Sequence, residues 1–422
     1  MYLFQNNLLA LLTLITPNSY KLMKKLASLF AVFLLIPLFT VASESGDRDI
    51  PAEVAQLTDS LKKQFAPDRR VALLDIDYSF SDKNVMLRGV TTSAEAKNVL
   101  LKELARKGYT VMDCLELLPD VKGLEGKTCG IINVSVANMR VAPDFSSEMM
   151  TQSLMGMPVR VLQRDGWVRI QTPDNYIAWV HRVGVHPVTE EEMAAWNKAE
   201  KIVVTAHYGF VYSEPNQTSQ TVSDVVAGNR LKWEGSKGAF YKVTYPDGRR
   251  GYISKSIAMP EKKWRSGLQQ DAAGIIRTAH TMMGIPYLWA GTSSKGVDCS
   301  GFMRTILFMH DIIIPRDASQ QAYVGEHIDI AADFSNLQPG DLIFFGRKAT
   351  PERKERVVHV GMYIGGKRFI HSQGDVHISS FDPADELFDE YNLGRLLFAT
   401  RVLPYINKEA GLNTTETNEY YK

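Results

Sequence analysis

Residues 284–310 constrain this chain most, because a loop rich in glycine and serine runs directly into an apolar segment there. The loop ends in Asp298-Cys299-Ser300-Gly301, and the apolar residues after it recur at spacings that suit one buried helix face. This order predicts a helix that begins at Cys299. Free N–H groups and the positive end of the helix dipole favour a thiolate at that position, so we predict a lowered thiol pKa and a nucleophilic cysteine. The alternative is an ordinary buried cysteine, since free cysteine is among the most buried residue types.

A second signal lies in residues 357–372, where two strand-like runs flank Gly365-Gly366 and carry His359 and His371. With a two-residue loop, His359 faces Ser372 and the two histidines point to opposite sheet faces. One extra loop residue brings His371 opposite Gly361, so that both rings share a face. A nucleophile, a base and a group that orients the base require this second register. We therefore predict a three-residue loop or a bulge here, with glycine in the left-handed conformation.

With these motifs, residues 268–404 resemble a known family, the NlpC-type papain-like cell-wall cysteine peptidases. The matching segments, in the family's order, are Tyr287-x-Trp289-x-Gly291, residues 298–301, Pro315-Arg316-Asp317, residues 338–342, and residues 359–364 followed by His371. The resemblance implies that Cys299 attacks an amide, that His359 is its base, and that His371 orients His359. A strand histidine bonded to backbone is the alternative for His371. The Cys and His residues lack the paired spacing of zinc ligands, so neither a metal nor a cofactor is expected.

The resemblance also implies a substrate, a peptidoglycan stem peptide of the type L-Ala-γ-D-Glu-diamino acid with a free N-terminal amine. Asp298 would bind that amine, and Arg316 would pair with a substrate carboxylate. Asp298 as a helix cap is the alternative, and both roles are compatible. The other implied substrate contacts are Tyr287, Trp289 and Ser300, with Tyr176 and Glu148 from the domain before the peptidase.

Upstream of the peptidase, residues 130–187 and 200–258 are two copies of one unit. Gly156 and Gly228 are 72 positions apart, and Pro173 and Pro246 are 73 apart, so the repeat survives with one insertion. Short strands and closely spaced turns predict small β-barrels, which resemble bacterial Src-homology-3-like domains. Residues 47–128 form a small αβ module of open role, with a helix expected to start at a capping box on Thr92. Residues 405–422 are a polar tail that we expect to be disordered.

Residues 1–43 are predicted to be a leader, because Met23-Lys24-Lys25 precedes a short apolar run and small residues. Export to the periplasm or cell envelope follows, with no stable membrane anchor in the mature form; Met1 and Met23 both remain possible starts. Lys+Arg 48 against Asp+Glu 47 gives no support to nucleic-acid binding. Cys114 and Cys129 could pair after export or remain separate thiols.

The predicted fold class is α+β, a papain-like cysteine peptidase domain preceded by two small β-barrels and an N-terminal αβ module. The predicted function is an exported endopeptidase that hydrolyses the γ-D-Glu–diamino acid bond of stem peptides with free L-Ala. Two alternatives stay open. One is a Cys/His endopeptidase or amidase that acts on intact peptidoglycan, and the other is a non-catalytic wall-binding protein. The preferred diamino acid and the oligomeric state are also left open.

Overall fold

The computed structural model describes residues 50–422, so the leader predicted at residues 1–43 lies outside the described part of the chain. Pro51–Lys422 forms one compact unit. Across residues 50–422, every helix is too short or too polar to cross a membrane. The predicted α+β class, with β-rich barrels ahead of a mixed C-terminal domain, is confirmed.

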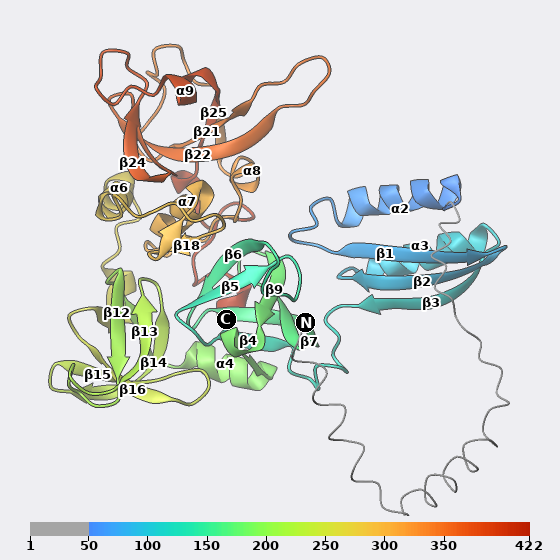
Figure 1. The fold of residues 1–422 in the computed structure, drawn as a ribbon, viewed down its shortest axis with the longest axis horizontal. Coiled ribbons are helices and arrows are strands. Elements are labelled where there is room, and N and C mark those ends of the chain that lie inside the picture. Colours follow the sequence, from blue (N-terminus) through green and yellow to red (C-terminus); the bar gives the residue numbers. More distant parts are fainter. Residues whose placement is uncertain (1–49) are drawn as a thin grey trace, which may run out of the picture. The chain divides into compact units, whose positions relative to one another are not determined.

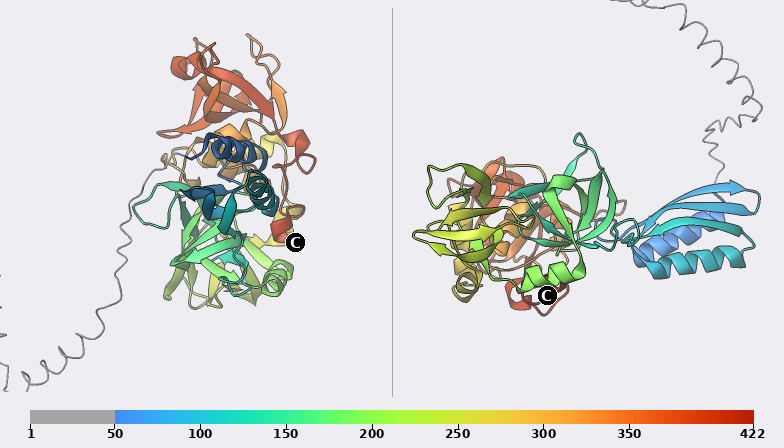
Figure 2. Two further views of the ribbon diagram at one scale, coloured as in Figure 1. Left: turned by 90° about the vertical axis from the view of Figure 1, so that its right-hand side faces the viewer. Right: turned by 90° about the horizontal axis from the view of Figure 1, so that it is seen from below.

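The N-terminal αβ module is a three-stranded sheet with two helices on one face (Figures 1 and 2). Strand β1 runs antiparallel to β2, while β3 runs parallel to β2 after the crossover through α3. Both helices bury one apolar face, with Val54 and Leu61 on α2 and Leu100 and Leu104 on α3. The elements are α2 (Ala52–Phe65), β1 (Leu74–Ser81), β2 (Asn84–Thr91), α3 (Ala94–Arg106) and β3 (Thr110–Leu117).

Helix α3 starts one residue later than the sequence predicts. The Ser93 hydroxyl accepts a hydrogen bond from the Ala96 amide at 3.0 Å and is therefore the N-cap. The Thr92 hydroxyl instead accepts a hydrogen bond from the Leu73 amide at 3.0 Å.

The two barrels have the same strand order, which confirms the repeat. The first sheet runs β10-β4-β7-β8-β9-β5-β6, and the second runs β17-β11-β14-β15-β16-β12-β13. Gly156 and Gly228 occupy equivalent turns with φ of +83° and +85°, which favour glycine. The strands of the first barrel are β4 (Cys129–Ile132), β5 (Val136–Arg140), β6 (Met149–Leu154), β7 (Pro158–Asp165), β8 (Trp167–Gln171), β9 (Ile177–His181) and β10 (Val185–Val188), with a 3-10 turn at Arg182–Gly184. Those of the second are β11 (Lys201–Val204), β12 (Tyr208–Tyr212), β13 (Thr221–Val226), β14 (Arg230–Lys237), β15 (Phe240–Thr244), β16 (Arg250–Ser254) and β17 (Ala258–Pro260).

Two short helices link these domains to their neighbours. Helix α4 (Glu190–Lys198) joins the two barrels and starts at a complete capping box on Thr189. Helix α5 (Glu261–Ser266) leads from the second barrel toward the C-terminal domain.

The C-terminal domain is built around α7 (Cys299–Phe308), every residue of which is buried. This helix packs against β22 and β23 of a six-stranded sheet with the order β20-β25-β21-β22-β23-β24 (Figure 1). The sheet strands are β20 (Glu326–Ile328), β21 (Leu342–Arg347), β22 (Arg356–Gly365), β23 (Arg368–Gln373), β24 (Asp375–Ser380) and β25 (Leu396–Arg401). The remaining elements are α6 (Ala272–Thr281), β18 (Thr292–Ser293), β19 (Gly296–Val297), α8 (Ala318–Gln321), α9 (Glu390–Gly394) and a 3-10 turn at Leu403–Tyr405.

The polar tail predicted to be disordered is instead ordered and packed. Leu412 is fully buried, and the Asn418 amide donates a hydrogen bond to the Pro173 carbonyl of the first barrel at 2.9 Å. The segment ends in a 3-10 turn at Glu419–Tyr421. Its polar side chains find buried partners far away in the sequence, which composition alone does not show.

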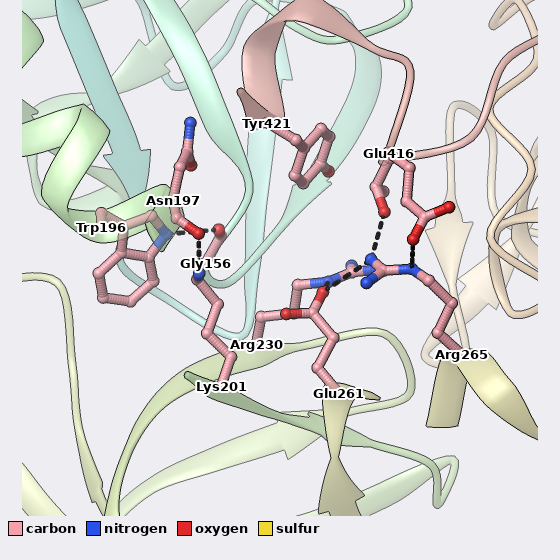
Figure 3. A pocket seen from close by; sticks show the side chains of 10 residues that line it. Gly156, Trp196, Asn197, Lys201, Arg230, Glu261, Arg265, Glu416 and Tyr421 are labelled. Carbon is pink, nitrogen blue, oxygen red and sulfur yellow. Dashed lines mark hydrogen bonds and ion pairs between the residues drawn. The ribbon is translucent and has the colours of Figure 1, made fainter. Parts of the chain in front are cut away.

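The tail also helps to close a joint between the second barrel and the C-terminal domain (Figure 3). Arg230 is the centre of this joint: its guanidinium donates to Glu261 at 2.9 Å and lies against the rings of Phe308 and Tyr421. A cavity of about 160 Å³ remains beside it. Burial lowers the pKa of Lys201, on the same cavity, to about 8. Charge and aromatic contacts from four segments therefore hold the domains together here.

Candidate functional site

Cys299 occupies the first position of α7, as predicted, and Asp298 is the N-cap. The Asp298 carboxylate accepts a hydrogen bond from the Gly301 amide at 2.7 Å. Gly301 has to lack a side chain, because a Cβ there would lie 1.9 Å from the Gly291 carbonyl oxygen. The glycine-rich loop therefore packs directly on the first turn of the helix, and this close approach sets where the cysteine sits.

The environment of the thiol differs from the prediction. Burial and the Asp298 carboxylate raise the pKa of Cys299 to about 11. Hydrogen bonds from the backbone amides of Val360 and Ser300 act in the opposite direction but are outweighed. The predicted lowering of this pKa is thus wrong for the resting protein, because desolvation of a nearly buried sulfur exceeds the effect of the helix terminus. The resting group is a thiol.

The histidine hairpin has the predicted register. His371 lies opposite Gly361, and the register shifts between Tyr363 and Gly365, which leaves a bulge at Ile364. The loop itself is a two-residue turn, Gly366-Lys367, with φ of +60° and +61°. Of the two predicted features, a three-residue loop or a bulge, the structure has the bulge. It places both histidines on one face of the sheet.

The two rings are joined by a short hydrogen bond. His359 Nε2 lies 2.8 Å from His371 Nδ1, and His371 Nε2 lies 3.1 Å from the Ser379 hydroxyl. Burial lowers the pKa of His359 to about 3 and that of His371 to about 2, so both rings are neutral near pH 7. With Nε2 of His359 engaged, its Nδ1 is the ring nitrogen left to act as a base. Ser379 was not predicted, because nothing in the local sequence of β24 marks it.

Strand β22, which carries His359, packs against α7, which begins with Cys299. The amide that hydrogen-bonds the thiol belongs to Val360, the residue after His359. Both functional groups are nearly buried, with 7% and 5% of their surface exposed. His359 is thus the sequence neighbour of the residue that contacts the thiol, and His371 is hydrogen-bonded to His359.

Arg316 is fully buried and bound to protein groups rather than turned outward. Its guanidinium donates to the two Asp298 carboxylate oxygens at 2.6 and 3.2 Å, and to the Ser300 hydroxyl at 2.9 Å. A further bond reaches Thr151 of the first barrel. The expected contact between Arg316 and a substrate carboxylate would have to compete with all of these partners. Arg316 instead fixes Asp298.

A pocket of about 370 Å³ opens beside Cys299. The first barrel forms one wall, where Glu148 accepts a hydrogen bond from the Trp289 indole at 3.0 Å. The Tyr176 hydroxyl donates to Asp317 at 3.1 Å on the same side. All the predicted substrate residues line this one pocket, namely Tyr287, Trp289, Asp298, Ser300, Arg316, Tyr176 and Glu148.

Sequence reasoning missed a contribution from the N-terminal module. Arg70 lines the same pocket and donates to Asp317 at 2.7 Å and to the Ser319 hydroxyl at 3.0 Å. Its Nε atom is held by Asp68 at 2.8 Å. Asp317 and Ser319 lie 247 and 249 residues from Arg70 in the sequence, so no local pattern could have revealed these contacts.

The two remaining cysteines do not contribute to the site. Cys114 is exposed and Cys129 is half-buried, and both are free thiols, so the open question of a disulfide is answered by two separate thiols. In the part of the chain that the structure describes, no group of three or more His, Cys, Asp or Glu residues is arranged to hold a metal ion.

Comparison with known proteins places three domains. The profile of the NlpC/P60 family matches residues 284–394, that of the bacterial dipeptidyl-peptidase Sh3 domain matches residues 139–183, and that of the bacterial SH3 domain matches residues 207–257. A gamma-D-glutamyl-L-lysine dipeptidyl-peptidase of Bacillus cereus is 33% identical over 236 residues, which cover 54% of this chain and 68% of that protein. Its namesake in Bacillus subtilis is 29% identical, covering 53% and 71%.

Solved structures agree with these matches. A crystal structure of an NlpC/P60 family protein from Bacillus cereus superposes with a TM-score of 0.56 at 26% identity, covering 65% of this chain and 100% of that one. An NlpC/P60 endopeptidase from Photobacterium damselae subsp. piscicida gives a TM-score of 0.50 at 13% identity, covering 82% and 81%. At that identity the second likeness is one of fold alone.

Proposed function

Because this chain belongs to the NlpC/P60 family of cysteine peptidases, we propose that it hydrolyses the γ-D-Glu–diamino acid bond of peptidoglycan stem peptides that begin with a free L-Ala. One observation carries the proposal. Glu148 and Tyr176 of the first barrel line the pocket beside Cys299, which supports a substrate that presents a short free end there. The named activity of the Bacillus relatives supports the same substrate.

The proposed chemistry begins with proton transfer. Nδ1 of His359 takes the Cys299 proton as the sulfur attacks the scissile carbonyl carbon, which forms a tetrahedral intermediate. That proton then passes to the diamino-acid nitrogen as the C–N bond breaks, leaving a thioester. Water, deprotonated by His359, hydrolyses the thioester and restores the thiol. His371 holds His359 in the tautomer with Nδ1 unprotonated.

The proposed amine site is acidic. Asp298 supplies charge, but its two oxygens already accept five hydrogen bonds, from Ala290, Ser300, Gly301 and twice from Arg316. Among residues 50–422, the Glu148 carboxylate accepts a hydrogen bond from the Trp289 indole alone, so it is the one with room for the ammonium group. The exposed Trp289 ring adds a face for cation–π attraction.

The test compares L-Ala-γ-D-Glu-diamino acid peptides with their N-acetylated forms. We expect cleavage of the free peptides between D-Glu and the diamino acid, and a loss of about 100-fold in kcat/KM on acetylation, since the acetyl group removes the ammonium charge that the Glu148 carboxylate would bind. Cys299→Ala should abolish cleavage, while Cys114→Ala, which removes an exposed thiol, should not. Equal rates on both peptides would favour an enzyme acting on intact peptidoglycan, and full activity of Cys299→Ala would exclude the cysteine mechanism.

Export is part of the same proposal and rests on residues 1–43. In a bacterial host, the full chain should be recovered from the periplasmic or extracellular fraction with its leader removed. A chain retained in the cytoplasm at full length would contradict this part without touching the peptidase chemistry.

A further inference from the structure

The proposed substrate carries a charge that the site described so far does not match. A γ-linked D-Glu uses its side-chain carboxyl in the peptide bond, so its α-carboxylate remains free close to the bond that is cut. A carboxylate that enters a partly closed pocket needs a cation or several hydrogen-bond donors. If the proposed function holds, one residue of this chain has to meet that carboxylate.

Three arginines line the pocket, and two of them are already committed. Arg316 is held by Asp298, Ser300 and Thr151, and Arg70 by Asp68, Asp317 and Ser319. Arg356 is different. Its exposed guanidinium makes no hydrogen bond or ion pair with any residue in the range 50–422.

Arg356 is also well placed with respect to the chemistry. It is the first residue of β22, three positions before His359 on the same strand, and it lines the pocket together with Val357 and Val358. Arg356 therefore lines the pocket that also contains Cys299.

The local charge around Arg356 calls for an anion. Arg347 lies directly opposite Arg356 on the neighbouring strand, and like charges in such a pair repel. Residues 347–356 contain five Lys or Arg and only two Glu. An anion bound at Arg356 would offset this repulsion.

An acidic and a basic side chain with free capacity come from different walls of the pocket. Glu148 belongs to the first barrel, and Arg356 belongs to the hairpin between β21 and β22. The fragment L-Ala-γ-D-Glu has the complementary pattern, with an ammonium group at one end and a free carboxylate toward the other.

We propose that Arg356 binds the free α-carboxylate of the γ-linked D-Glu and thereby selects stem peptides in which this carboxyl is not amidated. Arg is suited to the contact, because its planar fork can donate two parallel hydrogen bonds to a carboxylate. Amidation removes the charge and replaces an acceptor with a donor, so the same fork would then face an NH₂ group.

The test uses two peptides, L-Ala-γ-D-Glu-L-Lys and its α-carboxamide counterpart with D-isoglutamine. The full-length wild type should prefer the carboxylate by about tenfold or more in kcat/KM. Arg356→Ala should lose about 10- to 100-fold on the carboxylate peptide and change less than about twofold on the carboxamide. Arg356→Lys, which keeps the charge without the fork, should fall between. Arg353→Ala is the matched control, since it removes a cation from the same hairpin outside the pocket.

A binding measurement separates this inference from the proposed reaction. In a Cys299→Ala background, calorimetry with L-Ala-γ-D-Glu and with its carboxamide should show a carboxylate preference that Arg356→Ala abolishes. If neither peptide is cleaved by the wild type but this preference is found, the reaction is wrong and the Arg356 site stands. If Arg356→Ala affects both peptides equally, or neither, the inference is overturned.

Discussion

Nε2 of His359 lies 2.8 Å from Nδ1 of His371, and both rings are nearly or fully buried. This contact decides which nitrogen of His359 is available for chemistry. It also couples two strands whose register depends on the bulge at Ile364.

Replacing His371 should damage turnover more than binding. We expect His371→Ala to lower kcat by about 100-fold with little change in KM, because His359 then loses the partner that holds its tautomer. His371→Asn should recover part of the loss, since an amide can still bond Nε2. Steady-state kinetics checks this, with the exposed His327→Ala as the control. A kcat within twofold of wild type for His371→Ala would contradict an orienting role.

Activity should persist in mild acid. Burial lowers the pKa of His359 to about 3, so its base form is present at every pH above that value. An ordinary histidine, with a pKa near 6.5, would lose most of its base form between pH 7 and pH 5. We therefore expect kcat/KM to stay nearly constant over that interval. A limb with an apparent pKa near 6.5 in the pH profile would contradict the buried, neutral state.

Stability should instead fall in acid. The folded-state pKa values of His359 and His371 lie far below the ordinary value, so the unfolded chain takes up protons first as pH drops below about 6.5. Each histidine should cost about 1.4 kcal/mol of unfolding free energy per pH unit below that point. Urea unfolding at pH 7, 6 and 5 measures the slope. The His371→Gln variant should show a shallower slope than wild type, and equal slopes would show that His371 is not protonated on unfolding.

Removing Arg316 should destabilise the fold. The Arg316 guanidinium and the Asp298 carboxylate are both buried, so Arg316→Met leaves an uncompensated charge and should cost about 3–5 kcal/mol. The double variant Asp298→Asn/Arg316→Met should recover much of this loss, because the unpaired charge is then gone. Chemical unfolding checks both. A cost below about 1 kcal/mol for the single variant would show that Arg316 is not the structural partner of Asp298.

Arg70 should affect substrate binding from the N-terminal module. Arg70→Ala removes the donor that holds Asp317, which in turn accepts from the Tyr176 hydroxyl, so the pocket wall loosens. We expect KM to rise about 3- to 10-fold with kcat nearly unchanged. The exposed neighbour, Arg69→Ala, is the control. If Arg70→Ala behaves like Arg69→Ala, the module does not contribute to the pocket.

Local sequence patterns predicted the parts of the site that local forces control. The position of Cys299 follows from a capping Asp298 and the glycines that allow close packing, all within a few residues of one another. The pairing of His371 with Gly361 follows from strand alternation and the bulge at Ile364, next to a turn of left-handed residues. The repeat of the two barrels could be predicted from the sequence for the same reason, since equivalent turns need glycine at equivalent positions.

Other features depended on partners far away in the chain. The thiol pKa of Cys299 rises because the completed fold buries the sulfur beside Asp298. Arg316 turns toward Asp298, and the tail packs through Asn418 onto the first barrel, although neither segment shows this by itself. The order of chemical groups along the chain thus determined what the site contains. Desolvation and long-range hydrogen bonding, which exist only once the domains pack, decided how those groups are charged and which of them remain free for a ligand.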